Sequence, residues 1–353
     1  MVTKMYGYVL KSEIYQILYV QDVFSRYEDF LTIVTKAFDP KVLSLTVIPL
    51  VAAFSTRLYS RLLLSVLLTE YLNTILKWIL AEDRPFWWVR ETKEFSSLNR
   101  PKLYQNELTC EPSPGNPSGH LMTSTTFLYV IFSVLEDAGL QHGKAVVIVL
   151  RACYYLALCL ISISRMYFGC HFLHQCIFGI LFGVLFTKFT MSLSFEKYLS
   201  KLSRKRRLAY VFLTCLLLLG VYWGQKLFGV DPQWSVKMAF KWCEDPFFLD
   251  PSTTLVFSII RLSGALFAFA IVGPVLRTTS LNWKRSVPLT LAMMAAKWIA
   301  VGYTPRYYGV VLYYLYTFFV HMIFVYGYMR IVPALANVSS DSRVQRNMRL
   351  KTN

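Results

Sequence analysis

Charged residues are scarce in this sequence: only 16% of its 353 residues are Asp, Glu, Lys or Arg, whereas 55% are hydrophobic. An average soluble domain has roughly 25% charged residues, and the mean hydropathy of this chain is +0.43. The shortage of charge excludes a water-soluble enzyme. It predicts an all-α, polytopic membrane protein.

About nine apolar stretches are long enough to cross a membrane, since a spanning helix needs about 20 apolar residues. They are 30–50, 58–80, 120–135, 145–163, 172–191, 208–228, 253–276, 287–303 and 307–332. The first is the poorest candidate, because it contains Lys36, Asp39 and Lys41. No internal repeat or low-complexity segment divides the chain, so we expect one integral membrane domain over 1–353. The N-terminus lacks a continuous apolar core followed by small residues, so we expect no cleavable signal peptide.

Acidic residues are the rarer charge: 20 Asp and Glu stand against 37 Lys and Arg, which gives a net charge of +17. Basic residues gather over 197–207 and in the tail, and the positive-inside rule assigns both segments to the cytoplasm. With nine spans, the N-terminus lies on the other side and the C-terminus, with a tail over 333–353, is cytoplasmic. The sequon at Asn337 should then stay unmodified. Topology accounts for the charge without a nucleic-acid partner, although binding of anionic lipid or RNA over 197–207 is a second interpretation.

Paired cysteines at metal-ligand spacing are also absent, since the seven cysteines are spread singly through the chain. Cys110 and Cys243 both fall in loops assigned to the non-cytoplasmic side, where an oxidising lumen would permit a disulfide. The sequence leaves that pairing open. The chain shows no carboxylate cluster suited to Mg²⁺, so we expect no metal and no other cofactor.

Three short polar segments stand out in this apolar background, the first at the end of the second stretch. Glu70, Asn73 and Lys77 recur at i, i+3 and i+7, so they share a helix face that must point into the bundle. Arg84 follows seven residues later, and Pro85 disfavours helical geometry for it. We expect the helix to end there, with Arg84 at the membrane surface above Lys77. The alternative is that both cations only snorkel to the interface.

The second segment, Pro117-Ser118-Gly119-His120, follows a run of turn-forming residues and opens the third stretch. Ser118 is placed as an N-cap, with Gly119 and His120 in the first helical turn. The free N–H groups and positive dipole end of a helix start form an anion site, which could hold a phosphate. The alternative is an ordinary capped helix whose glycine relaxes a tight entry.

The third segment, Ser164-Arg165 with His171 six residues later, forms a short turn between the fourth and fifth stretches. Arg165 offers a planar fork of donors suited to phosphate oxygens. His171 can act as a nucleophile or a general acid/base near neutral pH. His174, one helical turn further, is either a neighbour of this site or an interfacial imidazole.

All three segments can meet, because the loop 81–119 and the turn 164–171 fall on the same non-cytoplasmic side. Together they supply three cations and two imidazoles, a set that suits the binding and breaking of a phosphate ester. The other two histidines are weaker candidates. His142 falls in a cytoplasmic connection, and His321 falls inside the last span, where a satisfied interior histidine is expected.

The three segments resemble the signature of the type-2 phosphatidic-acid phosphatase superfamily, which vanadium haloperoxidases share. Its pattern is Lys-x6-Arg-Pro, Pro-Ser-Gly-His and Ser-Arg-x5-His-x3-Asp. This sequence matches every position except the last, where Gln175 replaces an Asp that often orients the nucleophilic histidine. Gln175 can accept a hydrogen bond but adds no negative charge. The carboxylate's role therefore does not carry over, and Asp39 or a backbone carbonyl is the alternative.

The chain is more similar still to the glucose-6-phosphatase catalytic subunits of the endoplasmic reticulum. The likeness includes the segments around Lys77, Cys110, Ser164 and Lys241, the nine spans and the length, and glutamine at position 175 is itself a trait of that family. The resemblance implies a phosphatidic-acid-phosphatase-like helical core over about 58–191, with a lumenal active site in the endoplasmic reticulum membrane. It also implies a role in gluconeogenesis, with glucose 6-phosphate as substrate and a separate glucose-6-phosphate transporter as functional partner.

The resemblance makes His171 the phosphate acceptor, and displacement chemistry gives His120 the role of general acid and then general base. The groups expected to bind the phosphate oxygens are Lys77, Arg84, Ser118, Gly119 and Arg165. No metal is required by this design.

Two rival functions remain open at the level of sequence. A lipid phosphate phosphatase would use the same catalytic residues but admit its substrate through a lateral gap toward lipid. An anion transporter would bind its cargo with Lys77, Arg84 and Arg165 without chemistry. The sequence assigns neither the sugar-contacting residues nor the oligomeric state.

Overall fold

The computed structural model describes residues 2–139, 143–276, 281–305 and 309–336, and the elements in these ranges are all helices. The expected all-α class is confirmed. His142, Asn337 and the part of the expected tail over 337–353 lie outside the described residues. Residues 333–336, the first of that segment, are helical.

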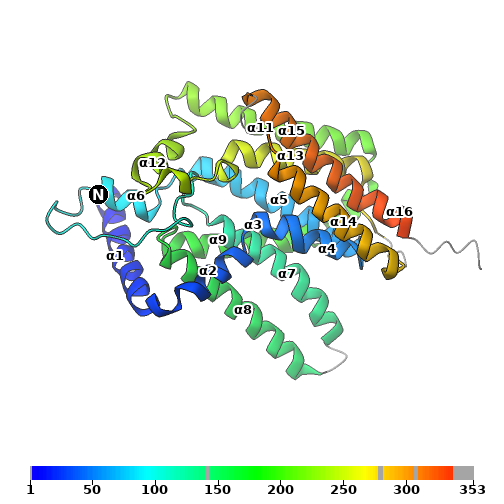
Figure 1. Ribbon diagram of the computed structural model, residues 1–353, viewed down its shortest axis with the longest axis horizontal. Coiled ribbons are helices and arrows are strands. Elements are labelled where there is room, and N and C mark those ends of the chain that lie inside the picture. The colour runs from blue at the N-terminus through cyan, green and yellow to red at the C-terminus, as the bar shows by residue number, and fades with distance from the viewer. Residues whose placement is uncertain (1, 140–142, 277–280, 306–308, 337–353) are drawn as a thin grey trace, which may run out of the picture.

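The helices follow one another along the whole chain (Figure 1). Those before the loop 92–118 are α1 (Val2–Val23), η1 (Ser25–Tyr27), α2 (Glu28–Ala37), α3 (Pro40–Val42), the π-helical η2 (Leu43–Val47), α4 (Ile48–Ala52), α5 (Thr56–Leu80) and α6 (Pro85–Glu91). Those after it are α7 (Gly119–Gly139), α8 (Lys144–Tyr167), α9 (Leu173–Thr190), α10 (Leu193–Lys201), α11 (Arg204–Leu227), α12 (Trp234–Trp242), η3 (Pro246–Phe248), η4 (Pro251–Thr253), α13 (Leu255–Val272), α14 (Trp283–Gly302), α15 (Val310–Tyr326), the π-helical η5 (Gly327–Ile331) and α16 (Val332–Ala336).

Within the described ranges, seven helical segments are long and apolar enough to cross a membrane, so this is a multi-pass membrane protein. They are Thr56–Glu91, Gly119–Gly139, Lys144–Tyr167, Leu173–Thr190, Arg204–Leu227, Leu255–Val272 and Val310–Ala336.

Two of the nine stretches counted in the sequence differ from these seven. The stretch 30–50 breaks at Asp39, whose carboxylate accepts hydrogen bonds from two following N–H groups, and at Pro40, which lacks an N–H for a continuing helix. The second stretch, 287–303, lies in α14, which is helical over 20 residues but carries three cations, including the buried Lys297. The count of nine spans is therefore approximate.

Helices α7 and α9 pack closely, with α5 and α8 beside α7. Two glycines of α9 permit this approach: a Cβ on Gly179 would lie 2.8 Å from the carbonyl oxygen of Ser118, and one on Gly183 would lie 2.9 Å from that of Met122. Small residues allow such close contact between membrane helices. The N-terminal ends of α7 and α9 are joined as a result, and Ser118 N–H donates to the Gln175 carbonyl oxygen at 3.0 Å.

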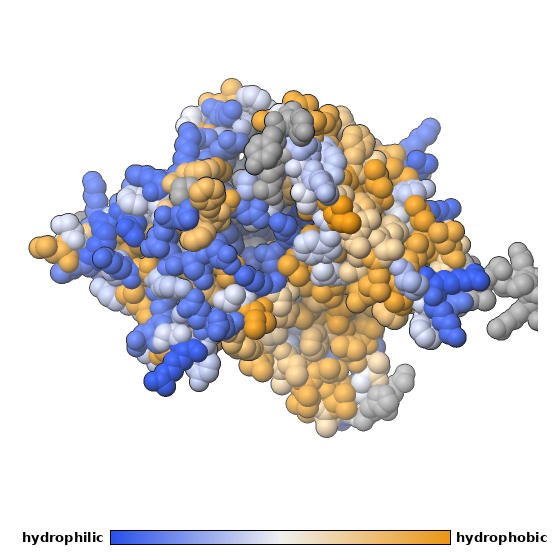
Figure 2. Space-filling model, in the orientation of Figure 1, coloured by the Kyte–Doolittle hydropathy of each residue, from blue (hydrophilic) through white to orange (hydrophobic). Residues whose placement is uncertain are grey.

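Four of these helix ends meet at one end of the molecule, where the C-terminal ends of α5 and α8 lie near the N-terminal ends of α7 and α9 (Figure 1). Helices α1, α6 and α12 also lie at this end. Figure 2 shows polar side chains gathered here and again near α16, with apolar side chains over α7, α8 and α14 between them. The fold thus brings the three polar segments of the sequence together at one face.

The C-terminal half packs against α5 through α13, which also contacts α11 and α15. Arg261 of α13 pairs with Glu70 of α5 inside the bundle. Glu70, Asn73 and Lys77 are all buried, so the inward-facing polar face expected from their spacing is confirmed. Such pairing is what a charge inside a membrane bundle requires.

Candidate active site

Lys77 lies near the C-terminal end of α5 and is 4% exposed. Its ammonium donates a hydrogen bond to the carbonyl oxygen of Pro114. Asn73, on the same face, donates to the carbonyl oxygen of Pro117 at 3.2 Å. The loop 92–118 is thus fastened over the inner face of α5. Because Lys77 and Arg84 are buried beneath it, the interpretation that they only snorkel to the interface is wrong.

Arg84 lies beyond the end of α5, which ends at Leu80, earlier than expected. Its backbone is extended, as Pro85 predicts. The guanidinium is fully buried and does not lie at the membrane surface, because the loop 92–118 covers it. Its Nε donates to the Ser113 carbonyl oxygen at 2.6 Å, and its Nη2 donates to Ser113 Oγ at 2.9 Å. Its Nη1 lies 3.3 Å from His171 Nε2.

Ser118 immediately precedes α7, as expected, and Gly119 is the first helical residue. The Ser118 side chain is fully buried, yet among the described residues its hydroxyl has no hydrogen-bond partner. The expected N-cap bond is therefore not made. An unsatisfied buried hydroxyl costs roughly 1–3 kcal/mol, so this group is available to an anion at the positive end of α7.

Arg165 lies near the end of α8, and the carboxylate of Glu111 lies between it and Arg84. The sequence pattern does not predict Glu111 as a site residue. Glu111 accepts a hydrogen bond from Arg165, and its Oε2 lies 2.8 Å from Arg84 Nη2. Burial alone would raise the pKa of Glu111, but Arg165, Arg84 and two histidines outweigh it and hold that pKa well below its ordinary value. Glu111 is therefore ionised. Within the described ranges, Arg165 Nε has no hydrogen-bond partner.

These groups form one arrangement of positive charge and free donors, which we call the anion cradle. Its members are Lys77, Arg84, Ser118, Gly119 and Arg165. The carboxylate of Glu111 already occupies part of it, which demonstrates that the cradle holds an anionic group with oxygens at hydrogen-bonding distance.

His171 lies in the turn between α8 and α9 and is fully buried. Its Nδ1 is 3.3 Å from Oε1 of Gln175, whereas its Nε2 faces Arg84. With the ring hydrogen on Nδ1, Nε2 carries the lone pair toward the cradle. Burial lowers the pKa of His171 well below its ordinary value, and the three cations of the cradle lower it further, against the opposing charge of Glu111. The neutral, nucleophilic form is favoured.

His120 lies in the first turn of α7 beside the cradle. Its Nε2 is 3.4 Å from Asp39 Oδ2, and its Nδ1 is 3.7 Å from Glu111 Oε1. Burial raises the pKa of Asp39, but the hydrogen bond and charge of His120 act against it and leave the pKa below its ordinary value. Asp39 thus faces His120. The alternative in which Asp39 replaces the missing carboxylate beside His171 is wrong, because Gln175 itself contacts that ring.

A disulfide fixes the part of the loop that carries Glu111. Cys110 and Cys243 are bonded, with Cα atoms 5.7 Å apart, so the pairing that the sequence left open is present. It joins the loop 92–118 to the end of α12. His174 contacts Glu13 and Glu82, which makes it a neighbour of the site and not an interfacial imidazole.

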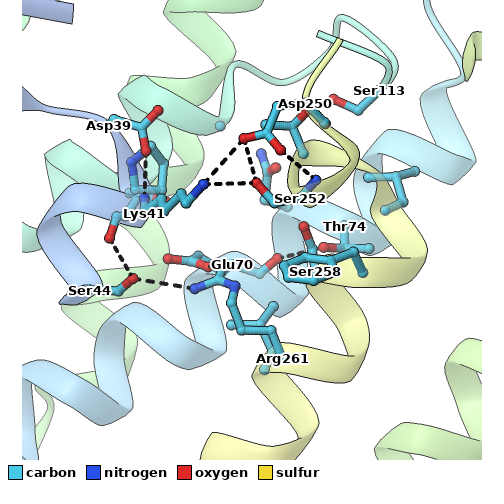
Figure 3. Close-up of a pocket in the computed structure, with 18 of the residues that line it drawn as sticks. Asp39, Lys41, Ser44, Glu70, Thr74, Ser113, Asp250, Ser252, Ser258 and Arg261 are labelled. Carbon is cyan, nitrogen blue, oxygen red and sulfur yellow. Dashed lines mark hydrogen bonds and ion pairs between the residues drawn. The ribbon is translucent and has the colours of Figure 1, made fainter. Parts of the chain in front are cut away.

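A cavity continues from the cradle toward α3 and α13 (Figure 3). Its volume of about 150 Å³ leaves room for roughly five water molecules, at about 30 Å³ for each. The polar side chains on its far walls include Asp39, Lys41, Ser44, Glu70, Asp250, Ser252 and Arg261. Lys41 Nζ lies 3.3 Å from both Asp250 Oδ2 and Ser252 Oγ. The cavity therefore suits a small molecule with many hydrogen-bonding groups.

Comparison with known proteins identifies the family. The model of the PAP2 superfamily matches residues 58–199. The chain is 32% identical over 323 residues to glucose-6-phosphatase 3 of Bos taurus, covering 87% of this chain and 89% of the bovine protein. This chain belongs to the glucose-6-phosphatase family. The glucose-6-phosphatase family also includes glucose-6-phosphatase 2 of Mus musculus, 30% identical over 269 residues, with 73% of this chain and 74% of the mouse protein covered.

A further member of the glucose-6-phosphatase family, catalytic subunit 1 of Haplochromis nubilus, is 29% identical over 275 residues, covering 75% of this chain and 77% of that protein. No solved structure matches the chain. Membership of the glucose-6-phosphatase family, within the PAP2 superfamily, makes this chain a phosphoric monoester hydrolase. A purely transporting role for the cations of the cradle is set aside.

Proposed function

We propose that this glucose-6-phosphatase family member hydrolyses glucose 6-phosphate to glucose and inorganic phosphate in the lumen of the endoplasmic reticulum, through a phosphohistidine on His171. The neutral, buried imidazole with its Nε2 facing the cradle supports the role of nucleophile. The names of the relatives support the substrate.

The reaction takes two displacements. In the first, His171 Nε2 forms a bond to phosphorus, the bond from phosphorus to the sugar oxygen breaks, and protonated His120 gives its proton to that oxygen. In the second, neutral His120 takes a proton from water as the water oxygen attacks phosphorus. The bond from phosphorus to His171 then breaks and frees the ring. Asp39, whose Oδ2 is 3.4 Å from His120 Nε2, lies where it can orient that ring.

The cradle stabilises the charge that develops on the phosphoryl oxygens. Its three cations contact the oxygens, and the free hydroxyl of Ser118 and the free Nε of Arg165 supply donors that otherwise lack partners in the described structure. Glu111 and the phosphate compete for the same guanidinium donors, so we expect the carboxylate of Glu111 to withdraw when substrate binds.

The polar cavity beside the cradle is the observation that favours a sugar phosphate over a lipid phosphate. An acyl chain in this cavity would desolvate Lys41, Asp250 and Ser252 without giving them hydrogen bonds, which is costly. Sugar hydroxyls both donate and accept, so they can satisfy such groups. We propose that the sugar lies against these side chains, on the α13 side of the cradle.

The disulfide supports a lumenal site, because Cys110 and Cys243 lie at the same end of the molecule as the cradle and disulfides persist in oxidising compartments. On this account the N-terminus is lumenal and the C-terminus is cytoplasmic. A phosphorylated sugar made in the cytoplasm cannot cross the bilayer unaided, so a glucose-6-phosphate transporter would deliver the substrate.

Phosphate release by the purified protein in detergent tests the proposal, with glucose 6-phosphate, mannose 6-phosphate and phosphatidic acid compared at equal concentration. We expect the sugar phosphates to be hydrolysed, glucose 6-phosphate fastest, and vanadate to inhibit. The His171→Ala variant measures contaminating phosphatase. Preferential hydrolysis of phosphatidic acid would replace the proposal by the lipid phosphatase that the sequence left open.

A further inference from the structure

A chain of hydrogen bonds leads from His171 away from the cradle, on the side opposite to Arg84. Gln175 Oε1 faces His171 Nδ1 at 3.3 Å and also accepts from the Phe172 N–H at 3.2 Å. The amide nitrogen of Gln175 donates to Glu82 Oε2 at 3.0 Å and to the carbonyl oxygen of Asp83 at 2.8 Å. Gln175 is fully buried, and these four contacts are the hydrogen bonds of its side chain among the described residues.

The contacts of Gln175 determine which end of its amide faces the catalytic ring. An amide can rotate by half a turn and exchange its oxygen for its nitrogen, and only its partners decide between the two. Glu82 supplies an acceptor with a full negative charge, so the –NH₂ end is drawn to it and the oxygen is left facing His171 Nδ1. That oxygen accepts a hydrogen from Nδ1, which leaves Nε2 unprotonated and directed at the cradle.

Glu82 is itself held in place by His174. Nε2 of His174 lies 3.0 Å from Glu82 Oε2, and Nδ1 lies 2.6 Å from Glu13 Oε2. The backbone N–H of His174 also donates to Glu13 Oε1 at 3.1 Å. Because a neutral imidazole has one hydrogen, His174 donates to both carboxylates only in its protonated form. Two carboxylates and one imidazolium leave one negative charge beside Gln175.

We propose that Glu82, held by His174 and Glu13, is a positioning residue that fixes the amide of Gln175 and, through it, the tautomer and ring orientation of His171. This inference rests on the proposed role of His171 as the nucleophile. It gives the acid–imidazole–acid group formed by Glu13 of α1, His174 of α9 and Glu82 from the segment between α5 and α6 a role in the reaction, although none of its members touches the substrate. It also explains how a glutamine can take the place of an aspartate beside the nucleophile. The negative charge lies on Glu82, which contacts Gln175 and not the ring of His171.

A charge exchange between positions 82 and 175 tests the proposal. Glu82→Gln removes the charged acceptor, and we expect the rate of phosphoenzyme formation and kcat to fall by about tenfold or more, the usual cost of losing such a supporting contact, with KM nearly unchanged. Gln175→Glu places two carboxylates about 3 Å apart and is expected to be worse, since like charges at that distance cannot both ionise freely. The combined variant restores one donor and one carboxylate between the two positions. We expect it to be at least about tenfold faster than Gln175→Glu alone.

Controls separate this proposal from loss of folding and from failure of the proposed function. Glu107→Gln, at an exposed ion pair with Lys36, is the matched carboxylate-to-amide change and should alter nothing. The natural protein must first be shown to form a phosphohistidine. If it forms none, the proposed function itself is refuted, and the positioning role of Glu82 falls with it. If the natural protein is labelled and Glu82→Gln reacts at the natural rate, or if the combined variant is no faster than Gln175→Glu, Glu82 does not position the catalytic histidine.

Discussion

The ionisation of His171 controls the first chemical step, because only the neutral imidazole can attack phosphorus. Burial and the three cations of the cradle lower its pKa well below the ordinary value of about 6.5. A lowered pKa keeps the ring neutral as the pH falls, so activity that depends on it is lost only at a pH below the ordinary range.

Removing a cation from the cradle should therefore move this pH dependence in a defined direction. In Lys77→Gln the pKa of His171 rises, and we expect the acidic limb of phosphoenzyme formation to move to higher pH than in the natural protein. Quenched-flow kinetics measure phosphoenzyme formation in both proteins with the same substrate. The second ionisation of the phosphate ester, near pH 6, is then the same in both measurements and does not affect the comparison. An unchanged or lower-lying acidic limb would show that the cations of the cradle do not control His171.

Glu111 offers a second test at single-residue scale, because it neutralises two fully buried guanidiniums. Glu111→Gln leaves Arg84 and Arg165 without a counter-charge and should destabilise the fold by roughly 3–5 kcal/mol. Vanadate binds the same donors, so it should raise the melting temperature of Glu111→Gln by more than it raises that of the natural protein. Equal protection of the two proteins by vanadate would contradict competition between Glu111 and the phosphate.

The cations and histidines of the site could be predicted from sequence, because their spacing and order form a recognisable pattern. Glu111 could not, since it is one acid among several mixed charges in the loop 92–118 and reaches the cradle only through the path of that loop. The role of Gln175 could not be predicted either. It depends on Glu82, which contacts Gln175, and on Glu13, which contacts His174, and both come from segments far away in the chain.

At the scale of helices and loops, the long apolar helices were predictable and the breaks between them less so. The segment 58–80 matches α5 closely, because a continuous apolar run leaves a helix as the only way to satisfy its backbone in lipid. The stretch 30–50 has a similar composition, but local hydrogen bonds that the Asp39 carboxylate accepts, next to a proline, outweigh the apolar pattern. The positions of such short polar breaks between helices are determined by helix-capping residues and not by hydropathy.

The disulfide makes a prediction for the loop 92–118 as a whole. Cys243→Ser frees this loop, which carries Glu111 and Ser113, from α12, and closing a cross-link of this kind contributes about 2–5 kcal/mol. We expect lower kcat/KM and faster proteolysis within 92–118. Cys153→Ser, at an exposed free cysteine, is the control. Peptide masses with and without reductant verify the bond. Full activity in a Cys243→Ser protein whose loop resists protease would show that the bond does not hold the site together.

At the scale of the whole molecule, the account requires the loop 92–118 to face the lumen and the basic segment 197–207 to face the cytoplasm. Pro101→Thr completes a glycosylation sequon at the exposed Asn99, whereas Lys201→Asn creates one with Ser203 in the basic segment. In microsomes we expect glycan on the first variant only, as a mobility shift removed by endoglycosidase. Glycan on the second variant, or on Asn337 of the natural chain, would reverse the topology.

Covalent trapping of phosphate tests the central claim, that His171 forms a phosphohistidine and His120 serves it as acid and base. The natural protein, His171→Ala and His120→Ala are each mixed briefly with glucose 6-phosphate carrying labelled phosphorus and quenched in alkaline detergent. The account predicts label on the natural protein, label that forms more slowly but is then retained on His120→Ala, because His120 is the acid of the first step and the base of the second, and no label on His171→Ala. Label on His171→Ala equal to that on the natural protein would contradict it.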